Sequence, residues 1–172
     1  VVLRDEGRFA EAETFAREAL AMTRKLFGAE HPDIALQLSN LGSILRGRGD
    51  YDGAIAAARE GLEMRRRLFG PDHEQVAMSL SNLGDLIETK GDLAEARALY
   101  EEALRVERKT LGPEHPRNAT SLAHLADVSL AQGDIGRAES LAREAMEIRR
   151  KALGEGHADF GTSLLTLGSI RL

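Results

Sequence analysis

A 42-residue repeat runs along the chain and restricts the architectures that it can adopt. Four segments of 22 residues align without a gap, and spacers of 20 residues separate them; the segments are 7–28, 49–70, 91–112 and 133–154. A chain built from one unit at a fixed period stacks that unit on itself, because each copy buries its apolar face against its neighbours. The period therefore predicts a solenoid rather than a single globular core.

Each half of the repeat has the pattern of a helix. In the second segment Asp50 suits an N-cap, Gly70 suits a C-terminal cap, and apolar residues recur at helical spacing, as at Ala54, Ala58 and Leu62. The spacers begin near a histidine and carry their own leucine stripe. Aromatic residues are only 4% of the chain, so typical strand formers are scarce. The fold class predicted is all-α, an α-solenoid of antiparallel helix pairs.

The small and large residues of these helices follow a known order. The motif runs Leu38-x-x-Leu41-Gly42-x-x-Leu45, then Gly49-x-Tyr51-x-x-Ala54, then Gly61-Leu62, and the alanine recurs as Ala12, Ala54, Ala96 and Ala138. This motif resembles the tetratricopeptide repeat, in the 42-residue variety of kinesin light chain. The resemblance implies a right-handed superhelix of about four repeats in a single array over 1–172. Its expected parts are a partial repeat 1–28, repeats 29–70, 71–112 and 113–154, and a partial repeat 155–172.

The resemblance also implies a function, namely non-catalytic protein–protein interaction. In this family the first helix of each repeat lines a concave groove that takes a peptide or a partner segment, and we expect the chain to be a scaffold or sensor arm of a larger bacterial protein in the cytoplasm. The groove-facing polar positions implied for this chain are Asn40, Ser43, Arg46, Asn82, Asp85, Glu88, His124 and Asp127. An asparagine amide both donates and accepts hydrogen bonds, which suits clamping an extended backbone.

The charge of these positions points to the kind of partner. Three carboxylates, Asp85, Glu88 and Asp127, outnumber the single Arg46 across the middle repeats. We therefore expect a protein or peptide partner with basic residues and expect an acidic peptide to be repelled. Apolar anchoring is expected around Leu36, Met78 and Leu130.

Metal, cofactor and catalytic sites are not predicted. The chain has no cysteine, which excludes disulfides and thiolate ligands. The periodic histidines (His31, His73, His115 and His157) are separated by at least a helix-pair width, about 10 Å, so they cannot share one ion and are interpreted as structural. His124 and Asp127 share a helix face and could orient a general base, but no nucleophile elbow or phosphate-binding loop accompanies them.

Two other functions stay open. Basic tracts near the ends of the second helices, such as Arg65-Arg66-Arg67, could align into a basic edge for nucleic acid. The net charge of -5 and the lack of interleaved aromatic residues make nucleic acid an unlikely partner. The interrupted repeats at both ends leave apolar faces that suit end-to-end self-association. No apolar run approaches 18 residues, so no membrane span is expected.

Overall fold

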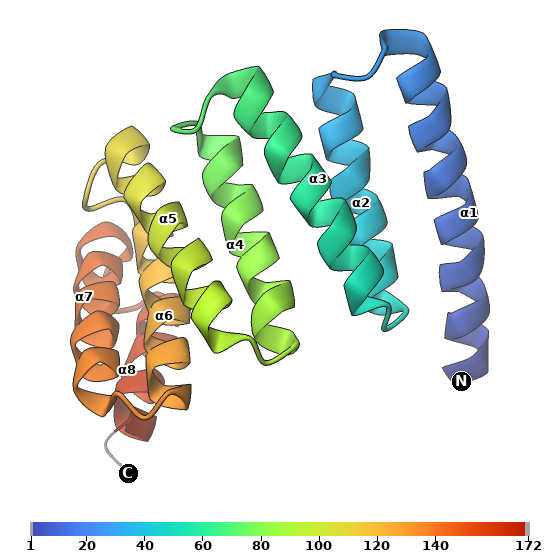
Figure 1. Ribbon diagram of the computed structural model, residues 1–172. Coiled ribbons are helices and arrows are strands. Elements are labelled where there is room, and N and C mark those ends of the chain that lie inside the picture. The colour runs from blue at the N-terminus through green and yellow to red at the C-terminus, as the bar shows by residue number, and fades with distance from the viewer. Residues whose placement is uncertain (1, 171–172) are drawn as a thin grey trace.

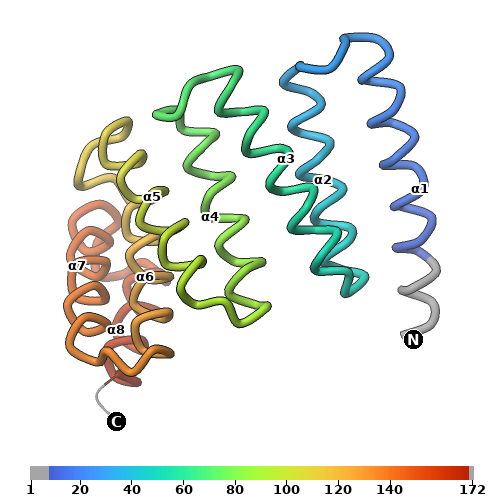
Figure 2. The backbone as a smooth tube through the Cα atoms, in the orientation of Figure 1, coloured from blue at the N-terminus to red at the C-terminus, as the bar shows by residue number. Residues whose placement is uncertain are grey.

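The computed structural model describes the backbone of residues 2–170 and the side chains of residues 8–170, and this part of the chain is helical with no strand. The helices stack in chain order (Figure 1). They are α1 (Val2–Phe27), α2 (Pro32–Gly47), α3 (Tyr51–Phe69), α4 (Glu74–Thr89), α5 (Leu93–Leu111), α6 (Pro116–Ala131), α7 (Ile135–Leu153) and α8 (Ala158–Ile170). The prediction of an all-α solenoid is confirmed. Figure 2 shows α1 and α8 at opposite ends of the stack.

Capping residues set the helix ends at the same point of every repeat. The second helices α3, α5 and α7 begin after an aspartate whose side chain accepts an N–H bond three residues on, as Asp92 does from Glu95. They end at glycines with φ between 83° and 88°, such as Gly112, where a side chain would be strained. Two turn types therefore alternate along the chain and fold each helix back on the last.

The four periodic histidines cap the first helices. Nδ1 of His31, His73, His115 and His157 accepts the backbone N–H two residues later, at 3.2 Å in each case. The rings of His31 and His73 also stack on Phe27 and Phe69, with centroids 4.3 and 4.7 Å apart. This is the structural role predicted for them at the loop-to-helix junction.

Small residues bring the two helices of a repeat together. Ala54, Ala96 and Ala138 are fully buried where the helices cross, as the motif predicts. In the pair α4 and α5, a Cβ built on Gly84 of α4 would lie 2.6 Å from Cε1 of Tyr100 on α5. Gly84 therefore leaves the space that the Tyr100 ring occupies.

Ion pairs join each second helix to the next second helix. Arg24 pairs with Glu60, Arg66 with Glu102 and Arg108 with Glu144, each 36 residues apart. Another pair occurs with its charges exchanged: Arg59 binds Glu95 at 2.6 Å, whereas one repeat later Glu101 binds Arg137 at 2.6 Å. These ion pairs recur at the repeat period, so each of them joins one repeat to the next along the stack.

Candidate functional site

All eight predicted site residues lie on the first helices α2, α4 and α6. Residues three apart on these helices share one face, and the outermost positions are exposed: Asn40 and Ser43 on α2, Asn82 on α4 and Asp127 on α6. Asp85 and His124 are half-buried on the same face. The predicted residues thus form a polar stripe that crosses three repeats.

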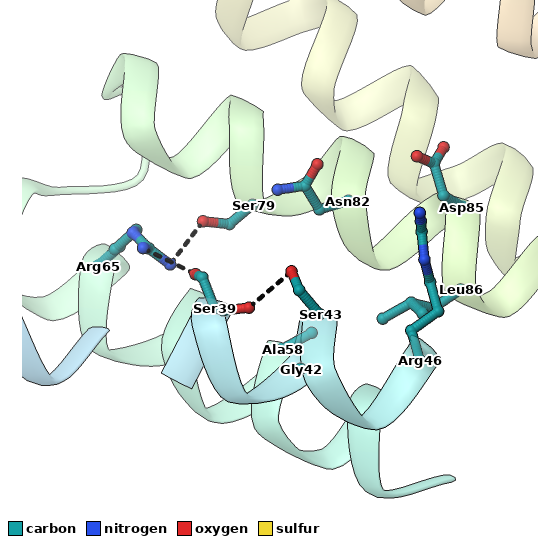
Figure 3. A pocket seen from close by; sticks show the side chains of 10 residues that line it. All are labelled: Ser39, Gly42, Ser43, Arg46, Ala58, Arg65, Ser79, Asn82, Asp85 and Leu86. Atoms are coloured by element: carbon teal, nitrogen blue, oxygen red, sulfur yellow. Dashed lines mark hydrogen bonds between the residues drawn. The ribbon is translucent and has the colours of Figure 1, made fainter. Parts of the chain in front are cut away.

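A pocket of about 260 Å³ opens between α2 and α4 (Figure 3). Four predicted residues line it, namely Ser43, Arg46, Asn82 and Asp85. The remaining lining residues are Ser39 and Gly42 of α2, Ala58 and Arg65 of α3, and Ser79 and Leu86 of α4. Asn40 lies on α2 but does not line the pocket. The pocket therefore has polar walls from two first helices and a floor from the second helix between them.

Arg65 forms part of that floor and is the main residue that the sequence interpretation placed wrongly. It is 5% exposed rather than part of a basic edge. Its guanidinium donates to Ser39 Oγ at 3.0 Å and to Ser79 Oγ at 3.1 Å (Figure 3). It also donates to the Ala35 carbonyl at 2.9 Å. Its Nε has no acceptor, and burial lowers the pKa of Arg65. Among the described residues no carboxylate pairs with this cation.

The equivalent position carries a polar residue in every repeat, which sequence reasoning missed. A side chain of each second helix bonds a side chain 14 residues on, in the next first helix: Thr23 with Gln37, Arg65 with Ser79, Glu107 with Ser121, and Arg149 with Ser163. A signal was available, because position 65 falls four residues after Gly61 on the apolar face of its helix. A polar residue on an apolar stripe marks a buried polar contact.

One repeat further on, a tyrosine fills the corresponding space. Tyr100 of α5 is fully buried, and its hydroxyl lies 2.7 Å from Asp85 Oδ1 and 2.8 Å from Glu88 Oε2. Burial and these two acceptors raise the pKa of Tyr100. The ring of His124 stacks on the Tyr100 ring with centroids 4.8 Å apart. The structure thus brings Asp85, Glu88 and His124 together around a residue that the sequence did not single out.

The space between α4 and α6 is acidic. Glu107 is 3% exposed, accepts a bond from Ser121 Oγ at 2.7 Å and lies 3.7 Å from Arg117 Nε. Desolvation raises the pKa of Glu107, while Ser121 and Arg117 oppose the shift. The pKa of Asp127 is also raised, by desolvation and by Glu88, while His124 opposes the shift. Together with Asp85, these groups give this part of the stripe an excess of carboxylates, as the sequence predicts.

The expected apolar anchors do not line the pocket. Leu36 and Met78 are 55% and 45% exposed on the first helices. Leu130 is half-buried and packs against the cluster formed by Ala126, Ala138 and their neighbours. Leu36 and Met78 therefore offer open contact area beside the stripe, whereas Leu130 belongs to the core.

The basic tracts are largely neutralised by carboxylates. Arg66 contacts Glu102 at 2.8 Å, Arg67 contacts Glu30 at 2.6 Å, and Lys151 contacts Glu114 at 2.6 Å. Arg108 and Lys109 pair with Glu144 and Asp72. A basic edge for nucleic acid is thus not supported. Within the described residues, no group of three or more His, Asp or Glu side chains is arranged to hold a metal ion, and no helix is long and apolar enough to cross a membrane.

An open stack of capped helix pairs with a polar stripe on its first helices is a helical-repeat solenoid. The family model described as tetratricopeptide repeat matches residues 1–67, 35–106 and 75–151, and the chain belongs to this family. Its members generally mediate protein–protein interaction and are typically non-catalytic. No curated protein sequence matches the chain significantly.

Solved structures resemble the fold over most of its length. BtubC (BKLC) from P. vanneervenii has a TM-score of 0.86 and 26% identity over 97% of this chain, which spans 66% of the length of that chain. Nearly identical TPR-like repeats of a putative kinesin light chain from Podosopora anserina have a TM-score of 0.82 and 23% identity, covering 95% of this chain and 78% of that one. The N-terminal domain of stress-induced protein-1 from C. elegans has a TM-score of 0.62 and 14% identity, over 82% and 97%. The kinesin-light-chain-like repeat predicted from the motif is therefore confirmed as the fold.

Proposed function

We propose that the chain is a non-catalytic binding module that holds an extended peptide or partner segment along the stripe on α2, α4 and α6. The observation that carries this proposal is the pocket between α2 and α4, because its walls are residues of that stripe. Exposed Asn40 and Asn82 stand beside it with amides that can bond a peptide backbone. The repeats form one array in a larger bacterial protein of the cytoplasm, as a scaffold or sensor arm.

The partner has basic residues where it crosses α4 and α6. Asp85, Glu88 and Asp127 lie along that part of the stripe. Bringing a lysine or arginine to these carboxylates relieves their mutual repulsion, whereas a second acidic group adds to it. Complementary charge of this kind chiefly sets specificity and the rate of association.

A peptide-display selection tests the proposal. The chain is compared with Asn82→Ala/Asp85→Ala, which removes two side chains of the stripe, and with Arg59→Ala/Glu95→Ala, which removes an exposed ion pair of the second helices. We expect basic, extended peptides that the first variant loses and the control retains. Enrichment that is indifferent to the stripe variant, or no enrichment at all, contradicts binding at this surface.

The exposed apolar residues of the outer helices favour a second candidate function, self-assembly through the ends of the stack. Phe15, Met22 and Leu26 of α1 and Leu164 and Leu165 of α8 are all exposed. A second copy that stacks α8 against α1 covers both faces. Sedimentation velocity over a wide concentration range tests this, and Leu26→Glu should abolish any association. A concentration-independent monomer refutes it.

A further inference from the structure

The two halves of the stripe differ in charge and in free space, and this difference defines the partner further. Resting on the function proposed above, we propose that the α2–α4 pocket binds an acidic side chain of the partner segment, while the α4–α6 position takes a basic side chain. The ligand is therefore a segment with both charges in a fixed order, rather than a uniformly basic one.

The α2–α4 pocket is lined by two arginines and one carboxylate, so positive charge is in excess there. Arg65 on the floor bonds only neutral oxygens, and its buried Nε has no acceptor. Arg46 on the wall is exposed, and its guanidinium is directed toward Asp85 (Figure 3). Asp85 is the single carboxylate among the lining residues. A buried cation without a partner carries a desolvation cost, and a ligand carboxylate compensates it.

The pocket walls also supply donors for that carboxylate. Asn82 presents an amide at the opening, and Figure 3 shows the Arg46 guanidinium at the same opening, directed toward Asp85. The Ser43 hydroxyl already donates to the Ser39 carbonyl at 3.1 Å. Ser39 and Ser79 lie between this opening and Arg65, and both hydroxyls already accept from Arg65. The ligand carboxylate thus accepts hydrogen bonds from Arg46 and Asn82 and experiences the positive potential of Arg65 on the pocket floor.

In the next repeat, a tyrosine ring fills the space that corresponds to the α2–α4 pocket. Tyr100 stands one period after Ala58, and its ring lies against Gly84, the counterpart of Gly42. The small Ala58 therefore leaves the pocket between α2 and α4 open, whereas the Tyr100 ring fills the equivalent space one repeat later. His124, which stacks on the Tyr100 ring, is the counterpart of Asn82. The α2–α4 pocket is in this sense an unfilled copy of an occupied one.

Charge is inverted between the same two places. Glu107 stands one period after Arg65, and Glu88 stands one period after Arg46. Arg117 Nε lies 3.7 Å from Glu107 and His124 Nδ1 lies 3.8 Å from Asp85, but Glu88 and Asp127 add further negative charge between α4 and α6. This position therefore repels the carboxylate that the first position attracts, and it attracts a basic group. Successive first helices lie about 10 Å apart, and an extended chain advances about 3.3–3.6 Å per residue. The acidic and basic residues of the ligand are accordingly separated by about three positions.

The test begins with the random-peptide selection on the chain. Fluorescence anisotropy then measures the affinity of the best peptide and of a second peptide in which its acidic residue is replaced by the corresponding amide. We expect a basic residue about three positions from an acidic one, and at least about a tenfold loss of affinity for the amide peptide. Arg46→Ala, at an exposed site, should bind both peptides equally. Arg59→Ala, an exposed arginine outside the pocket, should behave as the unmodified chain.

A second variant closes the pocket without removing a charge. Ala58→Tyr places a ring against Gly42 as Tyr100 lies against Gly84, so it should fold and lose the preference for the acidic residue. Arg65→Met probes the floor, with circular dichroism to confirm that the helices form. Both variants should keep the preference for a basic residue at the α4–α6 position.

The outcomes separate this inference from the function on which it rests. Peptides that depend on the stripe but show no acidic preference overturn the inference and leave the binding function standing. An acidic preference that survives Arg46→Ala and Ala58→Tyr also overturns it, because the carboxylate then binds elsewhere. Absence of any stripe-dependent peptide overturns the binding function and the inference together.

Discussion

The contact between Gly84 and Tyr100 gives the sharpest test of how the helix pairs pack. A Cβ at Gly84 would lie 2.6 Å from Cε1 and 2.9 Å from Cζ of the Tyr100 ring. That ring cannot swing away freely, because its hydroxyl contacts Asp85 and Glu88 and His124 stacks on its face. We predict that Gly84→Ala forces the two helices apart.

Two opposing effects set the change in the free energy of unfolding that Gly84→Ala causes. Alanine is favoured over glycine inside a helix by about 1 kcal/mol, whereas overpacking a buried contact costs about 1–3 kcal/mol. Because the ring is held in place, the upper part of that range applies, and Gly84→Ala should lower the free energy of unfolding by about 2 kcal/mol. At Gly42 the nearest atoms are the Ala54 carbonyl oxygen at 3.5 Å and Ala57 Cβ at 3.9 Å. Gly42→Ala is thus the matched control and should stabilise by up to about 1 kcal/mol.

Urea unfolding followed by far-UV circular dichroism measures both variants, and a double-mutant cycle adds the mechanism. Tyr100→Ala alone should cost about 3–5 kcal/mol through the cavity that it leaves. In that background Gly84→Ala should no longer destabilise, because the next repeat already combines Ala126 with Ala142 at these positions. Equal effects of the two glycine substitutions, or simple additivity in the cycle, would refute the packing argument.

Three further predictions concern the buried acid, the caps and the ion pairs. Desolvation raises the folded-state pKa of Glu107, so its contribution to stability is complete at low pH and is lost as the pH rises through that pKa. Glu107→Gln should therefore stabilise at neutral pH, with a gain that fades on acidification in urea titrations at several pH values. His73→Ala should cost about 1 kcal/mol in the same assay through the lost N-cap, and His73→Asn should retain most of it. Arg59→Glu and Glu95→Arg should each lower the free energy of unfolding by less than about 1 kcal/mol. The double exchange should restore the urea midpoint, because the following repeat has a glutamate and an arginine in that order, Glu101 and Arg137.

The fold was predictable from the sequence because the period and the caps repeat without interruption. Aspartates, glycines and histidines recur at fixed offsets, and each performs one local task whose geometry depends on a few neighbouring residues. The polar stripe was predictable for the same reason, since residues three apart share a helix face. Its residues Ser43, Arg46, Asn82 and Asp85 do line one pocket.

The floor of the pocket was not predicted because three adjacent arginines were treated as one feature. Consecutive residues of a helix point about 100° apart, so the tract divides among three surroundings. Arg65 enters the floor between α2 and α4, Arg66 reaches Glu102 in the next repeat, and Arg67 reaches Glu30 in the loop before its own repeat's first helix. A run of like charge in a helix is therefore resolved only when each residue is assigned to its own face.

In the proposed binding function, the second helices contribute to selectivity together with the stripe on the first helices. Ala58 and Tyr100 occupy the same repeat position, and Ala58 lines the open pocket between α2 and α4, whereas the Tyr100 ring lies against Gly84. Arg65 and Glu107 occupy another, and their charges decide which group that space attracts. The crossing alanines, the caps and the inter-helix ion pairs recur along the stack whichever residues occupy these two positions. The chain can therefore vary what each space accepts while the repeat geometry stays constant.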